Sequence, residues 1–332
     1  MTPSDVLKLC ADHQAAGALS SAFEHDVLRP LLGGRRLGAA EIARVRNLPE
    51  VYVEQVLDCL VSLEVVDVQA DGYALTQGWR ESLANDHDRL RAAFGNLAVS
   101  VRRWFSLGPI HHGSASGESQ EDEMFRTGNG LESYLLGVRH FNESMSDKVA
   151  DVLEPFIRDA ECRRVADIGG GHAAYTLKLL ARHPQLRGDV LDLPGTLAVS
   201  RSLNKAHPQR DRLEFVDTDA RELKPGELPY DLVMVNDLLH SFGREDKEKI
   251  VRNVLGIVRR GGLLVFTKFA HEERLPTRDN AFFSLKLFAN TNGTGFLESD
   301  EATLDMLQRC GARLLQSFSC GNKSGFVLQA AG

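Results

Sequence analysis

Carboxylates stand at the ends of three consecutive apolar runs in the second half of the chain. Asp167 and Asp192 each close such a run, and Asp219 follows the next one. If the runs are strands of one parallel sheet, the three side chains line a single crevice at its carboxyl edge. Carboxylates accept hydrogen bonds from hydroxyl and amino groups. The pattern therefore predicts a ligand that carries such groups.

Three glycines, Gly169, Gly170 and Gly171, begin two residues after Asp167. Glycine lets the backbone approach a ligand closely, and the helix expected next offers free N–H groups at its N-terminus. The spacing fits a dinucleotide site with Asp192 about twenty residues further on, and it also fits the glycine loop of S-adenosylmethionine sites. A carboxylate just before the glycines would repel pyrophosphate but suits the cationic amino and sulfonium groups of S-adenosylmethionine. We therefore favour an S-adenosylmethionine site.

The roles of the individual residues follow from their order along the predicted sheet. Asp192 is placed to bind both ribose hydroxyls, and Asp219 to accept a hydrogen bond from the adenine amino group. A fourth apolar run ends near Asn236. The predicted cofactor-binding residues are Asp167, Gly169, Gly171, Asp192, Asp219 and Asn236.

His240 comes shortly after the fourth run, on the side of the sheet where the carboxylates lie. Methyl transfer from a sulfonium needs alignment and a deprotonated nucleophile. A phenol, with a pKa of about 10, requires a base near neutral pH, and histidine suits that role. We therefore predict that His240 is the catalytic base, and we predict no metal ligands.

A small-molecule pocket is expected beside this base. Phe141 and Met145 belong to an apolar stripe at helical spacing over 132–156, which either packs on a neighbouring element or also faces the pocket. Lys268 and Arg139 would pair with an anionic acceptor, such as a carboxylate or a 2-oxo acid. The predicted pocket residues are Phe141, Met145, Arg139, Lys268 and Asn292.

Alternating strands and helices must position these groups. Such alternation from residue 163 onward predicts an α/β fold with a doubly wound, Rossmann-like parallel sheet. A helix over 244–259 is expected to end at Gly261 and Gly262. The last two strands, at 312–315 and 325–328, have a short connection, so one of them should run antiparallel. The other strands are predicted at 164–167, 189–193, 213–216, 231–235 and 263–266.

The first hundred residues read as helices at 39–46 and 51–64, followed by a hairpin around Asp71 and Gly72. This is the plan of a winged helix, which often binds DNA. However, residues 1–100 hold nine Lys and Arg against fourteen Asp and Glu, and the second helix has no Lys or Arg. A helix that faces phosphates should be basic. We therefore expect no nucleic-acid partner, and a role in dimerisation or as a lid over the substrate.

The chain has 332 residues and a formal net charge of −7. No run approaches the ~20 apolar residues of a membrane span, and no basic and apolar leader opens the chain. Five scattered cysteines without a Cys-x-x-Cys pair favour a reducing cytoplasm. The expected divisions are a winged-helix domain over 1–110, a linker with connecting helices over 111–160, and a cofactor domain over 161–332.

Taken together, the chain resembles class I S-adenosylmethionine-dependent small-molecule O-methyltransferases with an N-terminal winged-helix dimerisation domain. Plant caffeate enzymes and bacterial antibiotic-tailoring enzymes belong to this family. The resemblance rests on residues 40–43, 56–60 and 72–76 in the first half, and on 167–171, 192–194, 219, 239–240 and 261–262 in the second. It implies a homodimer, an S-adenosylmethionine site at the glycine loop and later acids, and a catalytic histidine at His240.

The sequence departs from the family pattern near the predicted base. His240, Ser241 and Phe242 stand where His-Asp-Trp is usual, and Lys268 stands where the family often has a glutamate that steers the histidine. The leading hypothesis is methyl transfer to a hydroxyl of a small natural-product acceptor. Methylation of a carbon on an anionic, 2-oxo acid-like acceptor is the first alternative. An NAD-dependent oxidoreductase and a non-catalytic member of the family are the others.

Overall fold

The computed structural model describes residues 3–104, 131–224, 229–271, 283, 287, 291 and 294–331. Its contacts divide the chain into two compact units, Met1–Arg102 and Arg103–Gly332. The predicted pocket residue Asn292 and most of the expected linker loop lie outside the described residues.

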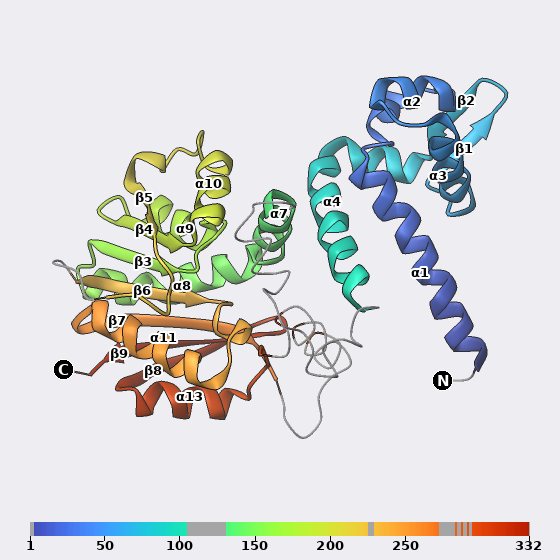
Figure 1. The fold of residues 1–332 in the computed structure, drawn as a ribbon. Coiled ribbons are helices and arrows are strands. Elements are labelled where there is room, and N and C mark those ends of the chain that lie inside the picture. Colours follow the sequence, from blue (N-terminus) through green and yellow to red (C-terminus); the bar gives the residue numbers. More distant parts are fainter. Residues whose placement is uncertain are drawn as a thin grey trace. The chain divides into compact units, whose positions relative to one another are not determined.

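The N-terminal unit is mostly helical and carries one hairpin (Figure 1). In the hairpin, Gln69 pairs with Gly72 in an antiparallel register. Gly72 has φ +121, and a Cβ there would lie 2.5 Å from the carbonyl oxygen of Leu37, so only glycine fits. The elements are α1 Pro3–Glu24, η1 Arg29–Gly34, α2 Ala39–Arg46, α3 Glu50–Ser62, β1 Val66–Gln69, β2 Gly72–Leu75 and α4 Gln77–Trp104.

Apolar side chains at helical spacing on α3 build the core of this unit. Val53, Val56, Leu57 and Leu60 are buried, as their spacing predicts. The exposed face of α3 carries acids and no Lys or Arg. A buried carboxylate, Asp26, accepts contacts from Arg29, Arg46 and His87 at 3.1–3.4 Å.

The C-terminal unit is built on a seven-stranded sheet with the order β5-β4-β3-β6-β7-β9-β8. The five strands from β5 to β7 are parallel, and β9 is antiparallel to both β7 and β8. This confirms the predicted α/β fold with an antiparallel strand at the end of the chain. The strands are β3 Arg164–Ile168, β4 Arg187–Asp192, β5 Leu213–Asp217, β6 Tyr230–Asn236, β7 Val258–Phe269, β8 Ala312–Cys320 and β9 Lys323–Ala330.

Helices cover both faces of this sheet (Figure 1). Successive residues of a strand point to opposite faces, so Leu232 and Met234 pack with α8 and α9, whereas Val233 and Val235 pack with α11 and α13. Burial on both faces explains why β6 is almost continuously apolar. The helices are α7 Leu131–Phe141, α8 Glu143–Asp159, α9 Ala174–Arg182, α10 Pro194–Leu203, α11 Arg244–Ile257 and α13 Asp300–Arg309, with short 3₁₀ turns η2 Arg210–Arg212 and η3 Leu239–Ser241.

Two boundaries differ from the prediction. The stripe over 132–156 is two helices, because the chain breaks between α7 and α8 at Asn142. The strand predicted to begin after the two glycines begins at Val258, which turns to extended backbone and pairs with Tyr230. Gly261 therefore lies inside β7, where φ +71 and the register shift beside it accommodate a local irregularity.

Candidate functional site

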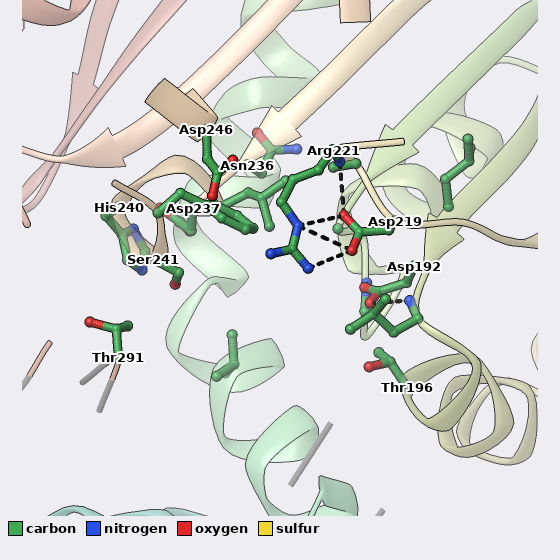
Figure 2. Close-up of a pocket in the computed structure, with 18 of the residues that line it drawn as sticks. Asp192, Thr196, Asp219, Arg221, Asn236, Asp237, His240, Ser241, Asp246 and Thr291 are labelled. Carbon is green, nitrogen blue, oxygen red and sulfur yellow. Dashed lines mark hydrogen bonds and ion pairs between the residues drawn. The ribbon is translucent and has the colours of Figure 1, made fainter. Parts of the chain in front are cut away.

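A cavity of about 690 Å³ opens at the carboxyl edge of the sheet. Its size is in the range of ligand pockets, about 300–1,000 Å³. Figure 2 shows Asp192 and Thr196 on one side of it and His240, Ser241 and Thr291 on the other. The lining includes Tyr134, Leu135, Val138 and Asn142 near α7, the loop residues Gly169, Gly171 and His172, and Asp192, Thr196, Asp219, Arg221, Asn236, Asp237, His240, Asp246, Thr291 and Thr294. Five of the six predicted cofactor residues thus meet in one cavity, together with the predicted base.

The glycine loop joins β3 to α9 in a backbone path that requires glycine. Gly169 has φ +66, and a Cβ there would lie 2.7 Å from a methyl group of Leu238. The N–H of Gly169 donates to the carbonyl oxygen of Leu191 at 2.8 Å, which ties the loop to β4. The loop backbone is thereby held against the cavity.

Asp192 organises the same loop from the end of β4. Its Oδ2 accepts from the N–H of Gly171 at 2.9 Å, and its Oδ1 accepts from its neighbour Leu193 at 2.7 Å. Burial raises the pKa of Asp192 to about 6, although these backbone hydrogen bonds oppose the shift. Each oxygen has a second lone pair, so a ligand with two adjacent hydroxyls fits this carboxylate.

Asp167 does not line the cavity. It is fully buried behind the loop, where its Oδ2 accepts from the Thr176 hydroxyl at 2.8 Å. A Cβ at Gly170 would lie 2.6 Å from its carboxyl carbon, so that glycine leaves room for the carboxylate. Burial raises the pKa of Asp167 to about 7, with hydrogen bonds from Thr176 and Asn236 opposing the rise. Asp167 was predicted to contact the ligand directly. In the structure it lies beneath the glycine loop and outside the cavity lining, because its side chain points into the protein interior.

The raised pKa of Asp167 predicts a pH-dependent stability. The folded chain binds the proton of the Asp167 carboxyl group more tightly than the unfolded chain does. Protonation of Asp167 therefore contributes to the free energy of unfolding fully below about pH 4, and this contribution is lost as the pH rises through about 7. Asp167→Asn, which cannot ionise, should gain roughly 2 kcal/mol relative to the wild type between pH 5 and pH 8. Urea unfolding at both pH values measures this gain. If the free energies of unfolding of the two proteins differed by the same amount at pH 5 and at pH 8, the raised pKa of Asp167 would be contradicted.

Asp219 is already paired within the cavity wall. Its two oxygens accept from Arg221 Nε at 3.0 and 3.1 Å and from Nη2 at 2.6 Å, and this pairing lowers the pKa of Asp219. Figure 2 shows the guanidinium reaching from Asp219 toward the middle of the cavity. The sequence reasoning missed Arg221. Its position two residues after the acid was the available signal, because an arginine so near along the chain can reach both oxygens of the carboxylate.

His240 lies in η3, just after β6, among aromatic rings. Its ring centroid is 5.4 Å from that of Phe269 and 5.8 Å from that of Phe283. Its carbonyl oxygen accepts from the N–H of Phe296 at 3.0 Å. Buried Lys247 donates to the carbonyl oxygen of Phe296 at 3.1 Å and pairs with Glu298 at 3.0 Å. The backbone of His240 is therefore fixed from α11 and from the segment before α13.

Four of the predicted acceptor-pocket residues do not line this cavity, although the ring centroid of Phe141 is 6.1 Å from that of Phe269. Met145 is buried in the core, and Phe141 is 58% exposed. Arg139 donates to Asn204 at 3.1 Å, and Lys268 pairs with Asp300 at 2.7 Å. None of these four lines the cavity as the described residues define it. Met145 lies in α8, beyond the break at Asn142, where the helical phase of α7 does not continue. A hydrogen bond to Asn204 occupies Arg139, and an ion pair with Asp300 occupies Lys268.

A buried polar network, which the sequence did not predict, connects Asn142 in the cavity wall to the sheet. Lys323, at the start of β9, is 3% exposed and donates to Asn142 and to Asp237. The same carboxylate oxygen of Asp237 accepts from Tyr175 at 3.4 Å. Asp237 has φ +52, a left-handed conformation that aspartate tolerates better than most residues. No local pattern signals this network, because Lys323 is 86 residues from Asp237.

No cluster of three or more His, Cys, Asp or Glu that could hold a metal ion occurs among the described residues. Within the same residues, no helix is long and apolar enough to cross a membrane.

The O-methyltransferase domain family matches residues 131–310, more than half of the chain. The protein therefore belongs to this family, which confirms the O-methyltransferase resemblance of its second half. The 3-hydroxy-5-methyl-1-naphthoate 3-O-methyltransferase of Streptomyces sahachiroi is similar to it, with 27% identity over 176 residues. That match spans 52% of this chain and about half, 49%, of the relative.

Two further relatives are similar over most of their length. The 3-amino-4-hydroxybenzoate 4-O-methyltransferase of Streptomyces cremeus is 25% identical over an alignment of 328 residues, and the match covers 93% of this chain and 85% of that protein. The structure of PigF with SAH, a Serratia protein described as an S-adenosyl-L-methionine-dependent methyl transferase, has a TM-score of 0.82 at 21% identity. It covers 99% of this chain and 100% of that chain. At this identity, the likeness shows the common fold.

Proposed function

We propose that this protein transfers a methyl group from S-adenosylmethionine to a hydroxyl of a small natural-product acceptor. Family membership and the convergence of the glycine loop, Asp192 and His240 on one cavity support this proposal. Similarity to PigF, whose structure contains SAH, also favours this cofactor. When bound, S-adenosylmethionine supplies an electrophilic methyl group on a good leaving group. The protein then has to align the acceptor and take up its proton.

The side chains of the cavity fit these tasks. We assign the ribose hydroxyls to Asp192 and the adenine end of the cofactor to Asp219 with Arg221. Asn236 lines the same cavity and is also assigned to cofactor binding. His240 accepts the proton of the acceptor hydroxyl as the oxygen attacks the methyl carbon. The rings of Phe269 and Phe283 beside His240 suit a planar aromatic acceptor. Two of the relatives are named for hydroxylated aromatic carboxylates, so such compounds are the first acceptors to test.

Carbon methylation of a 2-oxo acid is not favoured. The relatives are O-methyltransferases by name. Of the two cations invoked for that alternative, Lys268 pairs with Asp300 and Arg139 donates to Asn204. The direct test incubates the protein with methyl-labelled S-adenosylmethionine and a panel of hydroxybenzoates and hydroxynaphthoates. We expect labelled methyl ether together with S-adenosylhomocysteine. Binding of NADH without binding of S-adenosylhomocysteine would instead support an oxidoreductase.

We also propose that the protein is a cytoplasmic homodimer joined through its N-terminal unit, which has a winged-helix plan and does not bind nucleic acid. Exposed Val45, Val51 and Val68 offer apolar surface on α2, α3 and β1. The acidic face of α3 opposes contact with phosphates. Light scattering of the full chain tests the dimer, and a DNA titration at physiological salt tests the absence of binding. A monomer at micromolar concentration would overturn the first claim.

A further inference from the structure

His172 is a buried residue of the glycine loop whose hydrogen-bonding state is fixed by its neighbours. Its Nδ1 accepts from the backbone N–H of Ala174 at 3.0 Å. A neutral imidazole with one nitrogen accepting must carry its proton on the other. The remaining nitrogen, Nε2, is therefore a hydrogen-bond donor. His172 lines the cavity although it is only 5% exposed.

The surroundings keep this donor rigid. The His172 ring stacks on Tyr175 with centroids 6.1 Å apart and planes 27° apart. Its carbonyl oxygen accepts from Asn204, itself fully buried, at 3.4 Å. Asn204 in turn accepts from Arg139 at 3.1 Å. A donor held in this way needs no reorganisation when a ligand arrives.

The charge around His172 favours an anion. Burial and the nearby cations Arg139 and Lys323 together lower the pKa of His172 to about 4, with Asp237 opposing them. Asp237 is compensated by its buried pair with Lys323. The imidazole is thus neutral at physiological pH but lies in a net positive field. α9 begins at Ala174, so the positive end of its helix dipole also lies beside His172.

We propose that His172 Nε2–H is a carboxylate-binding donor of this cavity. This inference rests on the proposed function, in which two ligands can supply the group: the methionyl end of the cofactor, or an aromatic acceptor that bears a carboxylate. A neutral donor with compensated neighbours suits a singly charged group. Asp192 and Asp219 line the same cavity and would disfavour a more highly charged anion.

The test measures the contribution of the carboxylate within each protein variant. The dissociation constants of S-adenosylhomocysteine and of its decarboxylated analogue, the corresponding propylamine thioether, are determined for the wild type and for His172→Phe. The wild type should prefer the carboxylate form by about 10- to 100-fold, and His172→Phe should lose about tenfold or more of that preference. Because the ratio is taken within one variant, partial loss of folding cancels.

A second arm locates the carboxylate on the acceptor. The same variants are titrated with 4-hydroxybenzoate and with 4-hydroxybenzamide in the presence of S-adenosylhomocysteine. If His172→Phe lowers only the preference for benzoate over benzamide, the donor binds the acceptor. If it lowers the preference for S-adenosylhomocysteine over its decarboxylated analogue, the donor binds the cofactor. If His172→Phe changes neither ratio, the inference is overturned. A wild type that fails to bind S-adenosylhomocysteine at all would instead overturn the proposed function.

Matched variants separate the donor from the local turn. His207 makes the same backbone contact, with Nδ1 accepting from Gln209 N–H at 3.2 Å, but it does not line the cavity. His207→Phe should therefore leave both ratios unchanged. His172→Asn keeps an acceptor for the N–H of Ala174 on a shorter side chain, so it should preserve the loop and still lose the carboxylate preference. Full retention of that preference in His172→Asn would count against a fixed imidazole donor.

Discussion

Replacing His240 with alanine is expected to lower turnover by about 100-fold or more, while the affinity for S-adenosylhomocysteine changes little. A general base contributes about 10²- to 10⁴-fold to such a step, and His240 lies opposite Asp192 in the cavity (Figure 2). Its backbone is held through Phe296 and Lys247, so truncating the ring should not displace the η3 turn. The measurements are single-turnover rates with saturating cofactor and calorimetric binding of S-adenosylhomocysteine.

The acidity of the acceptor distinguishes a base from a merely structural ring. An acidic nitrophenol is largely ionised at the assay pH and needs no base, whereas an ordinary phenol, with a pKa of about 10, does need one. The rate loss of His240→Ala should therefore be much smaller for the nitrophenol. An equal loss for both acceptors would point to positioning through contacts with Phe269 and Phe283. His207→Ala, which removes a histidine outside the cavity, should behave as the wild type.

The edge of the sheet was predictable because strand ends are local features. An apolar run followed by an acid or a glycine loop fixes both the strand and the position of the polar group, and parallel strands bring these positions together. Asp192, Asp219, Asn236 and His240 accordingly line one cavity. Asp167 obeys the same pattern but is buried beneath the loop. Sequence spacing gives the edge of the sheet on which a side chain lies, and it does not give the packing of the loop above it.

The part of the cavity wall that α7 and Asn142 form was less predictable, because the phase of a helix depends on where the helix breaks. Treating 132–156 as one stripe selected Phe141 and Met145, whereas the structure has two helices here and Leu135 and Val138 of α7 line the cavity. Asn142 is tied to distant Lys323 at the start of β9. Such a contact is specified by tertiary packing alone.

Replacing Asp192 with asparagine should raise the dissociation constant of S-adenosylhomocysteine by about 100-fold or more. Two hydrogen bonds from hydroxyls to a charged oxygen are each worth about 1.5–3 kcal/mol. The asparagine also places an NH₂ group where the carboxylate now accepts from Gly171 or Leu193, which opposes the loop geometry. Asp189→Asn is the matched control, because Asp189 lies on the same strand and pairs with Arg164 and Tyr230 away from the cavity.

The pH dependence of binding ties this loss to the charge of Asp192. Because its pKa is raised to about 6, wild-type affinity for S-adenosylhomocysteine should weaken as the pH falls from 7 to 5 and Asp192 takes up a proton. Asp192→Asn should bind weakly throughout, with a much flatter profile. Asp167 titrates nearby, near pH 7, so Asp167→Asn should retain the acid-side weakening. Affinity that is independent of pH in the wild type, or that weakens equally in Asp192→Asn, would remove the ribose-binding role from this carboxylate.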